Sequence, residues 1–575
     1  MLISALATDY DGTLATHGSV TQETLAALQR LKASGRKLLM VTGRQFDDLQ
    51  SVFDHIGLFD AIVAENGALL YRPDLAEEQP LAPAPPPELV ERLLRKGVPL
   101  SVGRTILATV EPHETEVLAA IQELGLEWQI IFNKGSVMVL PPGVNKASGL
   151  LFTLDAMGLS PLNVVGVGDA ENDHAFLSAC GAAVAVENAL PMLKDAADVV
   201  APGAEGEGVT WLIDQLLDGP PDAITGKIRR HDLMLGRADG RDFSLSPDAG
   251  ATLIAGTSGV GKSTLATALI ERILAHGAQL CVIDPEGDYQ GLERISQIGE
   301  PDRPPAVDEA ITLLQRPATS LVVNLLGLQS GERPPAMAEL MGALSPLRSQ
   351  QGRPHWIVVD ESHHVLPREA VTAETAAPIR LAGMILITVE PPTLSKAVLS
   401  AIETVVAVGP HAADVVDTFC KTLGEPAPTP PSRAPREHEV VAWRRGEPAA
   451  VLVTVEPPKQ EHQRHVRKYA AGALQPEKSF YFTGPDSRLH LQAQNLALFL
   501  QMADGVDDAT WLFHLRNHDY SRWFAEAIDD DAMAAEAREA EAAHADDPAE
   551  SRAAIRRIVS RRYTAPSEGS FGESR

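Results

Sequence analysis

Residues 7–14 read ATDYDGTL. The two aspartates of this segment, Asp9 and Asp11, follow a strand-like apolar run that begins at Leu2, and a glycine and a threonine come next. Ligands of open α/β sheets bind beyond the carboxyl ends of the strands. We therefore expect Asp9 and Asp11 to lie at the ligand-binding edge of a sheet.

Strand-like and helical runs alternate through residues 1–215, which indicates a parallel sheet covered by helices. The strand-like runs are LISALATD, KLLMVTGR, AIVAEN, NVVGVGD and AAVAV. Residues from about 72 to 142 break this pattern with the proline-rich stretch PLAPAPPP and several short strands, and we expect them to form an inserted subdomain. Residues 216–229 are typical of a linker.

Further polar residues lie at the ends of later strand-like runs or just before one, namely Thr42, Lys146, Asp169 and Asp173. Together with Asp9 and Asp11 they supply what phosphoryl transfer needs. One carboxylate attacks phosphorus and becomes an aspartyl-phosphate, while a second protonates the leaving oxygen and then activates water. A hard cation takes oxygen ligands, and a hydroxyl and a lysine hold the phosphate oxygens.

Four segments resemble the four motifs of the haloacid-dehalogenase (HAD) superfamily: DYDGTL, VTGR, Lys146 and GDAENDHAFL. The segment AENGALLY, from Ala64, and residues 183–209 resemble the Cof-like sugar-phosphate phosphatases. The resemblance covers residues 1–215. It implies a Rossmann-like parallel sheet in which residues 72–142 form a cap that closes over the substrate.

The resemblance also implies roles for the site residues. Asp9 would be the nucleophile and Asp11 the general acid and base. Phosphate would be held by Thr42 and Lys146, with Asn172 beside them. Magnesium would bind Asp9, the backbone carbonyl of Asp11 and Asp169, with Asp173 and Asn172 in support.

A cap favours a small phosphorylated metabolite over a protein or polymer as substrate. Arg104 is a candidate substrate contact within the insert, because a charge between two apolar runs needs a reason. An ordinary surface arginine is the alternative.

A second phosphate-binding pattern lies at residues 253–264, which read LIAGTSGVGKST and contain the spacing G-x-x-x-x-G-K-[ST]. A strand that enters a glycine-rich turn before a helix directs backbone N–H groups at phosphates. Lys262 would reach the β and γ phosphates, and Ser263 would bind magnesium. The predicted ATP-binding residues are Gly256, Gly259, Gly261, Lys262, Ser263 and Thr264.

Alternating runs over residues 230–455 predict a second α/β domain, a P-loop NTPase domain. The run WIVVDE ends in Asp360 and Glu361. Asp360 would hold the magnesium through water, and Glu361 would polarise the attacking water. Compact nucleotide kinases typically lack the second acid, so the pair favours an ATPase.

The segments VIDPEGDY, VVDESHH and the run from Met384 resemble the HerA/FtsK branch of P-loop ATPases. That family usually carries a polar sensor, often glutamine, after the threonine of the last strand, whereas Val389 follows Thr388 here. We therefore expect ATP to bind, to turn over slowly and to order an oligomer.

HerA-like ATPases build their sites between subunits, and an arginine from the next chain completes them. Arg353 and Arg380 are the candidates for this arginine, and the sequence does not choose between them. His363 and His364 are interpreted as ordinary loop residues in preference to metal ligands.

The composition changes again after a second linker at residues 456–475. Residues 476–575 predict a small, mainly helical domain of unknown role. Its aromatic residues at helical spacing predict a core, with a surface for stacking on bases or sugars as the alternative; they are Trp511, Phe513, His514, Tyr520 and Trp523. A loose basic stretch before this domain is interpreted as solvated linker; it comprises Arg444, Arg445, Arg464, Arg467 and Lys468.

The chain has 575 residues, which is too long for one core, and a formal charge of −28, which disfavours binding to phosphate backbones. No apolar run is long enough to span a membrane, and no signal-peptide pattern opens the sequence. Its three cysteines lie far apart, as is typical of a reducing cytosol. We therefore expect a cytoplasmic multidomain enzyme.

Two functions of different classes are consistent with these patterns. The first is a magnesium-dependent phosphatase of a small phosphorylated metabolite, with an ATP-binding module that regulates or assembles it. The second is a HerA-like nucleic-acid translocase that carries a phosphatase for polynucleotide ends. The acidic charge and the cap favour the first. A phosphatase and kinase acting on one metabolite is a third possibility, which the pair Asp360 and Glu361 disfavours.

Overall fold

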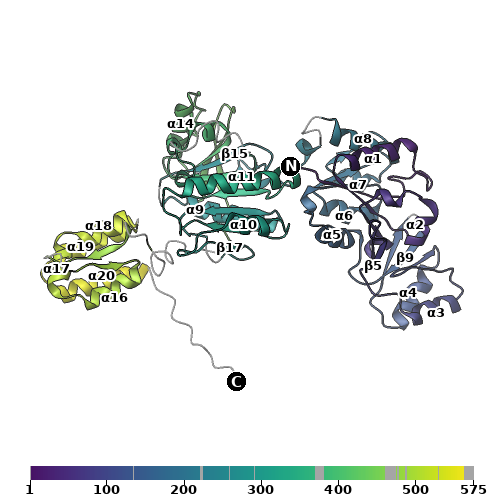
Figure 1. The fold of residues 1–575 in the computed structure, drawn as a ribbon, viewed down its shortest axis with the longest axis horizontal. Helices are drawn as coiled ribbons and strands as arrows, with labels where there is room; N and C mark the ends of the chain where they lie inside the picture. The colour runs from purple at the N-terminus through teal and green to yellow at the C-terminus, as the bar shows by residue number, and fades with distance from the viewer. Residues whose placement is uncertain are drawn as a thin grey trace, which may run out of the picture.

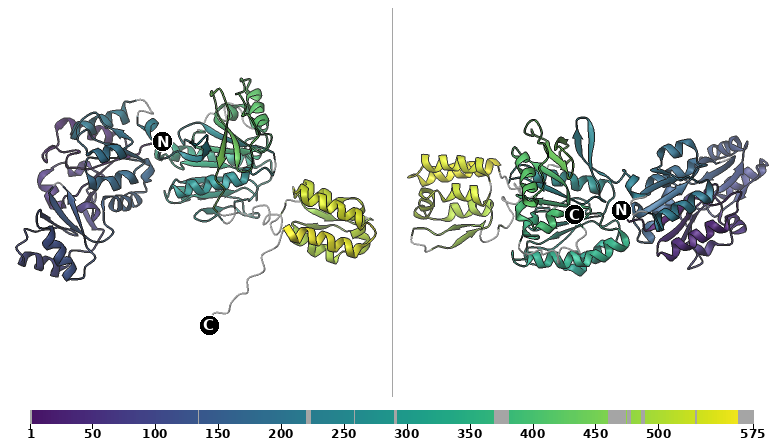
Figure 2. Two further views of the ribbon diagram at one scale, coloured as in Figure 1. Left: turned by 180° about the vertical axis from the view of Figure 1, so that it is seen from behind. Right: turned by 90° about the horizontal axis from the view of Figure 1, so that it is seen from above.

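The computed structural model describes residues 2–133, 135–219, 224–257, 259–289, 292–368, 381–459, 474, 478–485, 489–528 and 530–562. Three folded bodies follow one another along the chain (Figure 1). Views from behind and from above show that the first two bodies are built around sheets and that the third consists mainly of helices (Figure 2). No helix in the described part of the chain has the length and apolar character needed to cross a membrane.

The first body contains an eight-stranded sheet in the order β12-β11-β10-β1-β2-β3-β4-β5. Its strands are β1 (Ala5–Thr8), β2 (Lys37–Val41), β3 (Ala61–Ala64), β4 (Leu69–Arg72), β5 (Glu77–Pro80), β10 (Val164–Gly168), β11 (Ala182–Ala185) and β12 (Val199–Val200). All pairings are parallel except those of β4, and the central strands are fully buried, as their near-continuous apolar sequences predict.

Helices cover this sheet: α1 (Gln22–Ala33), α2 (Phe46–Val52), α5 (Lys146–Ala156), α6 (His174–Ala179), α7 (Pro191–Ala196) and α8 (Glu205–Leu217). The parallel sheet expected for residues 1–215 is therefore present. The carboxyl ends of β1, β2, β3 and β10 meet at one edge, which places the polar residues that follow them close together.

The insert has a sheet of its own, in the order β6-β7-β9-β8, and two helices. The elements are α3 (Pro87–Arg95), β6 (Ser101–Val102), β7 (Leu107–Val110), α4 (Glu114–Glu123), β8 (Gln129–Asn133) and β9 (Ser136–Leu140). Leu89, Leu93 and Val117 belong to a separate apolar cluster inside it. The expected start near residue 72 differs from this arrangement, because β4 and β5 pair as a hairpin that continues the main sheet to Pro80.

The segment expected to be a linker, residues 216–229, is partly built into the first body. Ile224 and Ile228 are buried in the same apolar cluster as the main sheet. Arg230 follows and pairs with Asp198, with 3.0 Å between Nη2 and Oδ2. The glycines and prolines of the segment suggested a linker, but its isoleucines complete the core.

The second body contains an eleven-stranded sheet in the order β14-β13-β23-β22-β21-β15-β20-β19-β16-β18-β17. Its strands are β13 (Leu233–Ala238), β14 (Arg241–Leu245), β15 (Ala251–Ala255), β16 (Leu280–Asp284), β17 (Ser296–Ile298), β18 (Leu321–Asn324), β19 (Trp356–Val359), β20 (Met384–Thr388), β21 (Ile402–Val408), β22 (Glu439–Arg444) and β23 (Val451–Val455). The run from β21 to β17 is parallel, and the rest is antiparallel.

The helices of this body are α9 (Lys262–Ala275), α10 (Val307–Leu314), α11 (Arg333–Gln351), α13 (Lys396–Ser400) and α14 (Ala412–Leu423). Strand β20 lies between β15, which leads into the glycine-rich turn, and β19, which leads into Asp360. The strands between these two motifs in sequence, β16, β17 and β18, lie on the far side of β19. The spatial separation of the motifs therefore comes from a strand that follows both of them in the chain.

The third body is mainly helical, as expected. It comprises β24 (Phe480–Phe482), β25 (Leu491–Ala493), α16 (Leu496–Gly505), α17 (Asp508–Arg516), α18 (Asp519–Glu526), α19 (Asp531–Ala543) and α20 (Pro548–Arg562). Trp511 and Tyr520 are fully buried and stack with 4.4 Å between ring centroids. The interpretation of the aromatic residues as core is confirmed for these two, for His514 and for Trp523.

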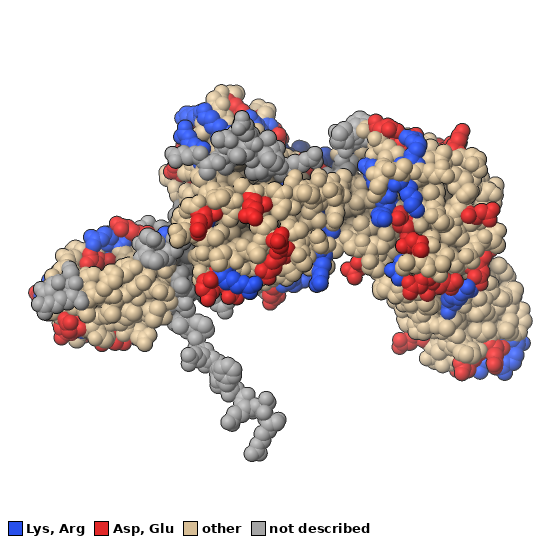
Figure 3. All heavy atoms as spheres, viewed as in Figure 1, with Lys and Arg blue, Asp and Glu red and all other residues tan. Residues whose placement is uncertain are grey.

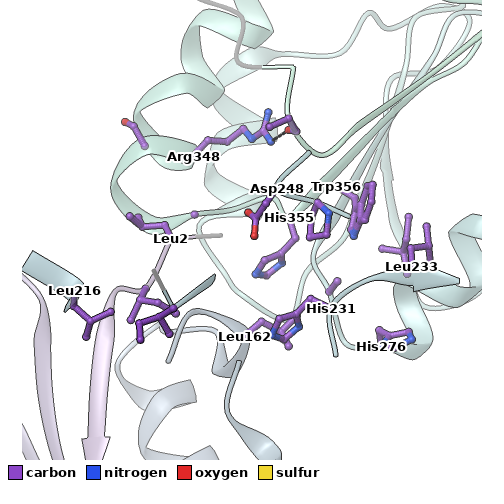
Figure 4. A pocket seen from close by; sticks show the side chains of 18 of the residues that line it. Leu2, Leu162, Leu216, His231, Leu233, Asp248, His276, Arg348, His355 and Trp356 are labelled. Atoms are coloured by element: carbon purple, nitrogen blue, oxygen red, sulfur yellow. Dashed lines mark hydrogen bonds between the residues drawn. The ribbon is translucent and has the colours of Figure 1, made fainter. Parts of the chain in front are cut away.

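The first two bodies meet at the amino ends of their strands. His355, before β19, contacts Asn163, before β10, with 3.1 Å between Nε2 and Oδ1. Arg353 donates to the carbonyl of Gly158 at 3.3 Å. A pocket of about 530 Å³ lies at this junction, with His231 and Trp356 among its lining residues (Figure 4). It lies away from the carboxyl edges that carry both predicted sites.

Candidate active sites

The buried charges of the first site centre on Lys146, the first residue of α5. Its ammonium donates to Asp9 Oδ1 and to Asp173 Oδ1, both at 2.6 Å. The three side chains are at most 5% exposed. Asp9 follows β1, and Asp173 ends the short helical turn η4 (Glu171–Asp173) after β10. Sheet topology therefore brings together residues that are far apart in sequence.

The electrostatics of this group are strongly perturbed. Burial raises the pKa of Asp9 to about 7, the neighbouring Asp173 and Asp169 add to the rise, and Lys146 opposes it. Burial by itself lowers the pKa of Lys146, but the charges of Asp173 and Asp9 outweigh it, and the net shift is upward. The lysine is therefore charged, and it compensates two buried carboxylates.

The same carboxylates offer a cation site. Oxygens of Asp9, Asp169 and Asp173 lie within 4.8 Å of one another. Asp173 Oδ2 already accepts the backbone N–H groups of Asp169 and Ala170, both at 2.9 Å, so it positions the loop as well. Buried carboxylate oxygens suit Mg²⁺.

A second observation supports a bound group at this site. Asn172 Oδ1 is buried and has no hydrogen-bond partner among the described residues, although a buried amide oxygen is costly to leave unpaired. Asn172 Nδ2 donates to Asn66 Oδ1 at 3.3 Å. The unpaired amide oxygen therefore fits a cation next to Asp9.

Thr42 follows β2 and is fully buried. Its hydroxyl accepts the backbone N–H of Arg44 at 3.1 Å, and its carbonyl accepts that of Asn66 at 3.0 Å. The predicted set thus lies at one edge of the sheet: Asp9, Thr42, Asp169, Asn172 and Asp173 follow the ends of strands β1, β2 and β10, and Lys146 begins helix α5.

Asp11 lies apart from the lysine and is held by a residue that the sequence prediction missed. Arg44 donates to both oxygens of Asp11, at 2.6 and 2.7 Å, and also to Asp48 at 2.7 Å. These hydrogen bonds, with Asp11 first, raise the pKa of Arg44 against the effect of burial. Arg44 is the last residue of the motif VTGR, so its place beside Thr42 was the available signal.

Arg104 does not reach the carboxylate cluster. Its guanidinium is held by Asp47 on α2, at 2.8 Å for Nη2, and by Glu78 on β5, at 3.0 Å for Nε. The expectation of a substrate contact is therefore replaced by an ion pair between the insert and the main domain.

The second site is built on the turn between β15 and α9. Gly259 and Gly261 have φ of 78° and 101°, which only glycine adopts easily, and a Cβ on Gly256 would lie 2.4 Å from the carbonyl of Val408. Lys262 is 6% exposed and donates to the carbonyl of Thr257 at 2.9 Å. Ser263 and Thr264 follow in the first turn of α9.

Asp360 and Glu361 follow β19, and the charge of Lys262, at the end of the glycine-rich turn, acts on Glu361. Asp360 is buried, and its Oδ1 accepts the backbone N–H of Glu361 at 2.9 Å. Burial raises the pKa of Glu361 to about 7, Asp360 and Glu286 add to the rise, and Lys262 opposes it. Glu361 has φ of 37°, an uncommon backbone conformation that is found at functional sites.

His363 takes part in this second site. Its Nδ1 lies 3.3 Å from Thr388 Oγ1 at the end of β20 and 3.5 Å from Glu361 Oε2. The interpretation of His363 as an ordinary loop residue is incomplete, because its ring joins the two strand ends at the site. The group of three metal-ligating side chains found among the described residues is that of Asp9, Asp169 and Asp173, and it does not include His363 or His364.

Two arginines, Arg353 and Arg380, were the candidates for completing the ATP site of a neighbouring subunit, and the structure describes only Arg353. Arg353 is 1% exposed and donates to the carbonyls of Leu314 and Gly158, so it is unavailable to a neighbouring subunit. Arg353 therefore stabilises the junction between the first two bodies. Arg380 lies outside the described residues, as do Arg464, Arg467 and Lys468.

Two family models match the chain. The haloacid dehalogenase-like hydrolase model matches residues 6–105 and 105–213, and the central domain of helicase HerA matches residues 251–329. The chain belongs to the haloacid dehalogenase-like hydrolases, and it joins such a domain to a HerA-like P-loop module.

Relatives of the first domain are named phosphatases. A phosphoglycolate phosphatase of Methanothermobacter thermautotrophicus is 33% identical over 223 residues, which is 98% of that protein and 37% of this chain. Phosphoglycolate phosphatase 2 of Saccharolobus solfataricus is 30% identical over 222 residues, 92% of that protein and 37% of this chain. A crystal structure of a haloacid dehalogenase-like hydrolase from Bacteroides thetaiotaomicron matches with 18% identity and a TM-score of 0.34, over 99% of that chain and 37% of this one.

Proposed function

We propose that this protein is a magnesium-dependent phosphohydrolase that acts on a small phosphorylated metabolite through an aspartyl-phosphate on Asp9. The observation that carries the proposal is the contact of Lys146 with Asp9 and Asp173 inside a buried carboxylate cluster. Residues 1–215, with the insert as cap, and 230–455 are the proposed functional domains.

In the proposed reaction an oxygen of Asp9 forms a bond to phosphorus, and the bond from phosphorus to the leaving oxygen breaks. Asp11, as the acid, gives its proton to that oxygen. The oxygen of a water molecule then bonds to phosphorus while Asp11 takes the proton of this water; the bond from phosphorus to Asp9 breaks, inorganic phosphate leaves and the Asp9 carboxylate is regenerated. Lys146 and Thr42 hold the phosphate oxygens. Asp11 must leave Arg44, or share it, to serve as the acid.

Magnesium would be held by Asp9, the backbone carbonyl of Asp11 and Asp169, with Asp173 and Asn172 in support. When bound, it would offset the negative charge of the phosphate and of the attacking carboxylate. The substrate class rests on the relatives, whose name is phosphoglycolate phosphatase, and on the resemblance to Cof-like sugar-phosphate phosphatases. We propose phosphoglycolate and sugar phosphates as the first substrates to assay.

Asp9→Asn tests the covalent mechanism because it keeps the shape of the side chain and removes the nucleophile. The full-length protein should hydrolyse p-nitrophenyl phosphate in magnesium and lose this activity in Asp9→Asn and in EDTA. Full activity of Asp9→Asn would exclude Asp9 as the nucleophile. A panel of small phosphoesters then ranks substrates by kcat/KM.

We further propose that the second domain binds ATP through Lys262, Ser263 and Asp360, and that ATP orders an oligomer or regulates the phosphatase. Lys262→Ala should abolish nucleotide binding and leave p-nitrophenyl phosphate hydrolysis largely intact. Loss of both activities would mean that the two sites are obligately coupled.

We also propose that the protein is cytoplasmic, which its three buried free cysteines support.

The match to the HerA central domain keeps a second function open, a nucleic-acid translocase that carries a phosphatase for polynucleotide ends. On the face shown in Figure 3, the described lysine and arginine side chains form small groups separated by acidic and uncharged surface. Hydrolysis of ATP that is fast and strongly stimulated by DNA would favour the translocase. Slow hydrolysis that DNA does not change would favour the metabolite phosphatase.

A further inference from the structure

The turn after β3, η2 (Glu65–Gly67), has a strained backbone at the edge of the first site. Glu65 and Asn66 have φ of 52° and 55°, in the left-handed region that residues with a Cβ seldom adopt. Both side chains are buried. Strain of this kind persists where the surrounding contacts determine the conformation, and it clusters at functional sites.

The Glu65 carboxylate reaches out of the main domain and binds the insert. It accepts four hydrogen bonds from the segment 104–106, which we call the cap loop. Oε1 accepts the backbone N–H of Arg104 at 2.9 Å. Oε2 accepts the backbone N–H and the hydroxyl of Thr105, at 2.8 and 2.7 Å, and the N–H of Ile106 at 3.2 Å. The carboxylate is fully buried and has no lysine or arginine partner in the described part of the chain.

The same turn contacts residues of the proposed phosphate site. Glu65 N–H donates to the carbonyl of Arg44 at 2.9 Å, and Asn66 N–H donates to that of Thr42 at 3.0 Å. Asn66 Oδ1 accepts from Asn172. Gly67 lies against the start of α5, since a Cβ there would be 1.9 Å from the carbonyl of Asn145.

The cap approaches the site at a second point. A Cβ on Gly43, next to Thr42, would lie 3.6 Å from the Met138 side chain of β9. The position of the cap therefore affects the space beside Thr42 and Asn172, and Glu65 is the residue that joins the cap loop to the turn.

The outer contacts of the cap are weaker than this inner one. Arg104 pairs with Asp47 and Glu78 at partly exposed positions, where an ion pair contributes little. Hydrogen bonds to a charged group contribute more, and a buried carboxylate that loses its donors bears the full cost of desolvation. The inner contact of Glu65 should therefore dominate the closed position of the cap.

We propose that Glu65 is a positioning residue whose carboxylate latches the cap loop over the phosphate site and thereby limits the size of the substrate. The part of the proposal that concerns substrates rests on the proposed phosphatase function. The latch itself is a structural statement and can be tested without activity.

Two variants break the latch in different ways. Glu65→Gln keeps the length of the side chain but turns one acceptor oxygen into an NH₂ group, which faces an N–H donor in either orientation of the amide. Gly103→Ala leaves Glu65 intact, but its Cβ would lie 2.7 Å from Glu65 Oε1 and would push the carboxylate off its donors. Gly57→Ala is the matched control, because its Cβ meets nothing within 4 Å.

Hydrogen exchange of the full-length protein tests the latch. The backbone amides of Thr105 and Ile106 should exchange at least tenfold faster in Glu65→Gln and in Gly103→Ala than in the wild type. In Gly57→Ala their exchange rates should equal those of the wild type. Unchanged exchange at these amides in either variant would overturn the latch.

The effect on substrate size is measured as the ratio of kcat/KM for adenosine monophosphate, a bulky ester, to kcat/KM for phosphoglycolate. Both variants should raise this ratio at least tenfold. An equal loss of activity on both esters would overturn the role in selectivity and leave a merely structural residue. Absence of Asp9-dependent hydrolysis in the wild type would refute the proposed function, and the exchange experiment would still decide the latch.

Discussion

A buried lysine between two carboxylates is the central feature of the first site at the scale of single residues. Lys146 compensates Asp9 and Asp173, and a cation bound by the same carboxylates would add positive charge. Breaking a buried ion pair by removing one partner leaves an uncompensated charge, which costs about 3–5 kcal/mol. A magnesium ion bound at this proposed site and Lys146 would therefore partly replace each other in the charge balance of the folded state.

The variant Lys146→Met tests whether magnesium compensates the carboxylates of Asp9 and Asp173 when the lysine is absent. In EDTA the variant should lose about 3 kcal/mol of unfolding free energy for the first domain, because Asp9 and Asp173 remain buried without their cation. In magnesium the loss should be smaller, while hydrolysis falls at least a hundredfold since no ammonium holds the phosphate. Urea unfolding with and without magnesium measures this, and an equal loss in both buffers would contradict it.

A second prediction concerns His363 at the proposed ATP site. The sensor amide expected at position 389 is replaced by valine, yet His363 lies between Thr388 and Glu361. Burial lowers the pKa of His363 to about 4, so the ring is neutral near pH 7 and is able to accept or donate. His363→Ala should bind ATP normally and hydrolyse it about tenfold more slowly, the size of effect expected for one positioning hydrogen bond. His364→Ala is the control, and an equal effect of both variants would contradict a specific role.

At the scale of elements, the start of α5 places the ammonium of Lys146. Asn145 caps this helix: its side chain accepts the N–H of Ser148 at 2.9 Å, and the Ser148 hydroxyl accepts the N–H of Asn145 at 3.0 Å. This reciprocal capping box satisfies two N–H groups that the helix leaves without partners. The cap therefore fixes the residue that follows it, Lys146.

Removing this cap should lower both stability and activity. Asn145→Ala should cost about 1 kcal/mol of unfolding free energy and raise KM more than it lowers kcat, because Lys146, the proposed phosphate ligand, would be held less precisely. Ser148→Ala removes only the returning bond and should have the smaller effect. Calorimetry and steady-state kinetics measure the two variants, and a larger effect of Ser148→Ala would contradict the capping argument.

The sequence predicted where the strands lie better than it predicted which strands pair with each other in the sheet. Each apolar run that ends in a site residue is a strand, because a buried parallel strand needs only local apolar sequence. The hairpin of β4 and β5 and the place of β20 between β15 and β19 depend on pairing between distant segments, which no local pattern contains. Glu65 was missed for the same reason, since its four donors lie about forty residues away in the cap loop.

At the scale of the whole molecule, the two proposed sites lie at the outer, carboxyl edges of sheets whose amino ends meet. Asn163 and His355 form this contact. Arg353 adds a hydrogen bond to the carbonyl of Gly158, and Ile228 is buried in the core of the first body. The proline and glycine residues that predicted a free linker gave no sign of these contacts, because burial of Ile228 depends on the folded first domain.

The junction contains a histidine whose neutral form is required. His355 Nδ1 accepts the backbone N–H of Gln279 at 2.9 Å, so its proton resides on Nε2, which faces Asn163 Oδ1. Burial lowers the pKa of His355 to about 3, and the nearby charges of Arg353, His231 and Arg348 act in the same direction. Protonation of Nδ1 would break the bond from Gln279.

Stability of the junction should therefore fall in acid. A histidine with a depressed folded-state pKa contributes fully above its unfolded pKa of about 6.5, and this contribution is lost as the pH falls from about 6.5 towards 3. At pH 5 the loss is about 2 kcal/mol, because the unfolded state binds a proton that the folded state excludes. Calorimetric unfolding of the wild type and of His355→Asn at pH 7 and pH 5 isolates the effect, since asparagine does not titrate. The second domain of the wild type should lose about 2 kcal/mol more than that of the variant over this interval. Equal losses would show that His355 is protonated in the folded protein at pH 5, which would contradict the depressed pKa.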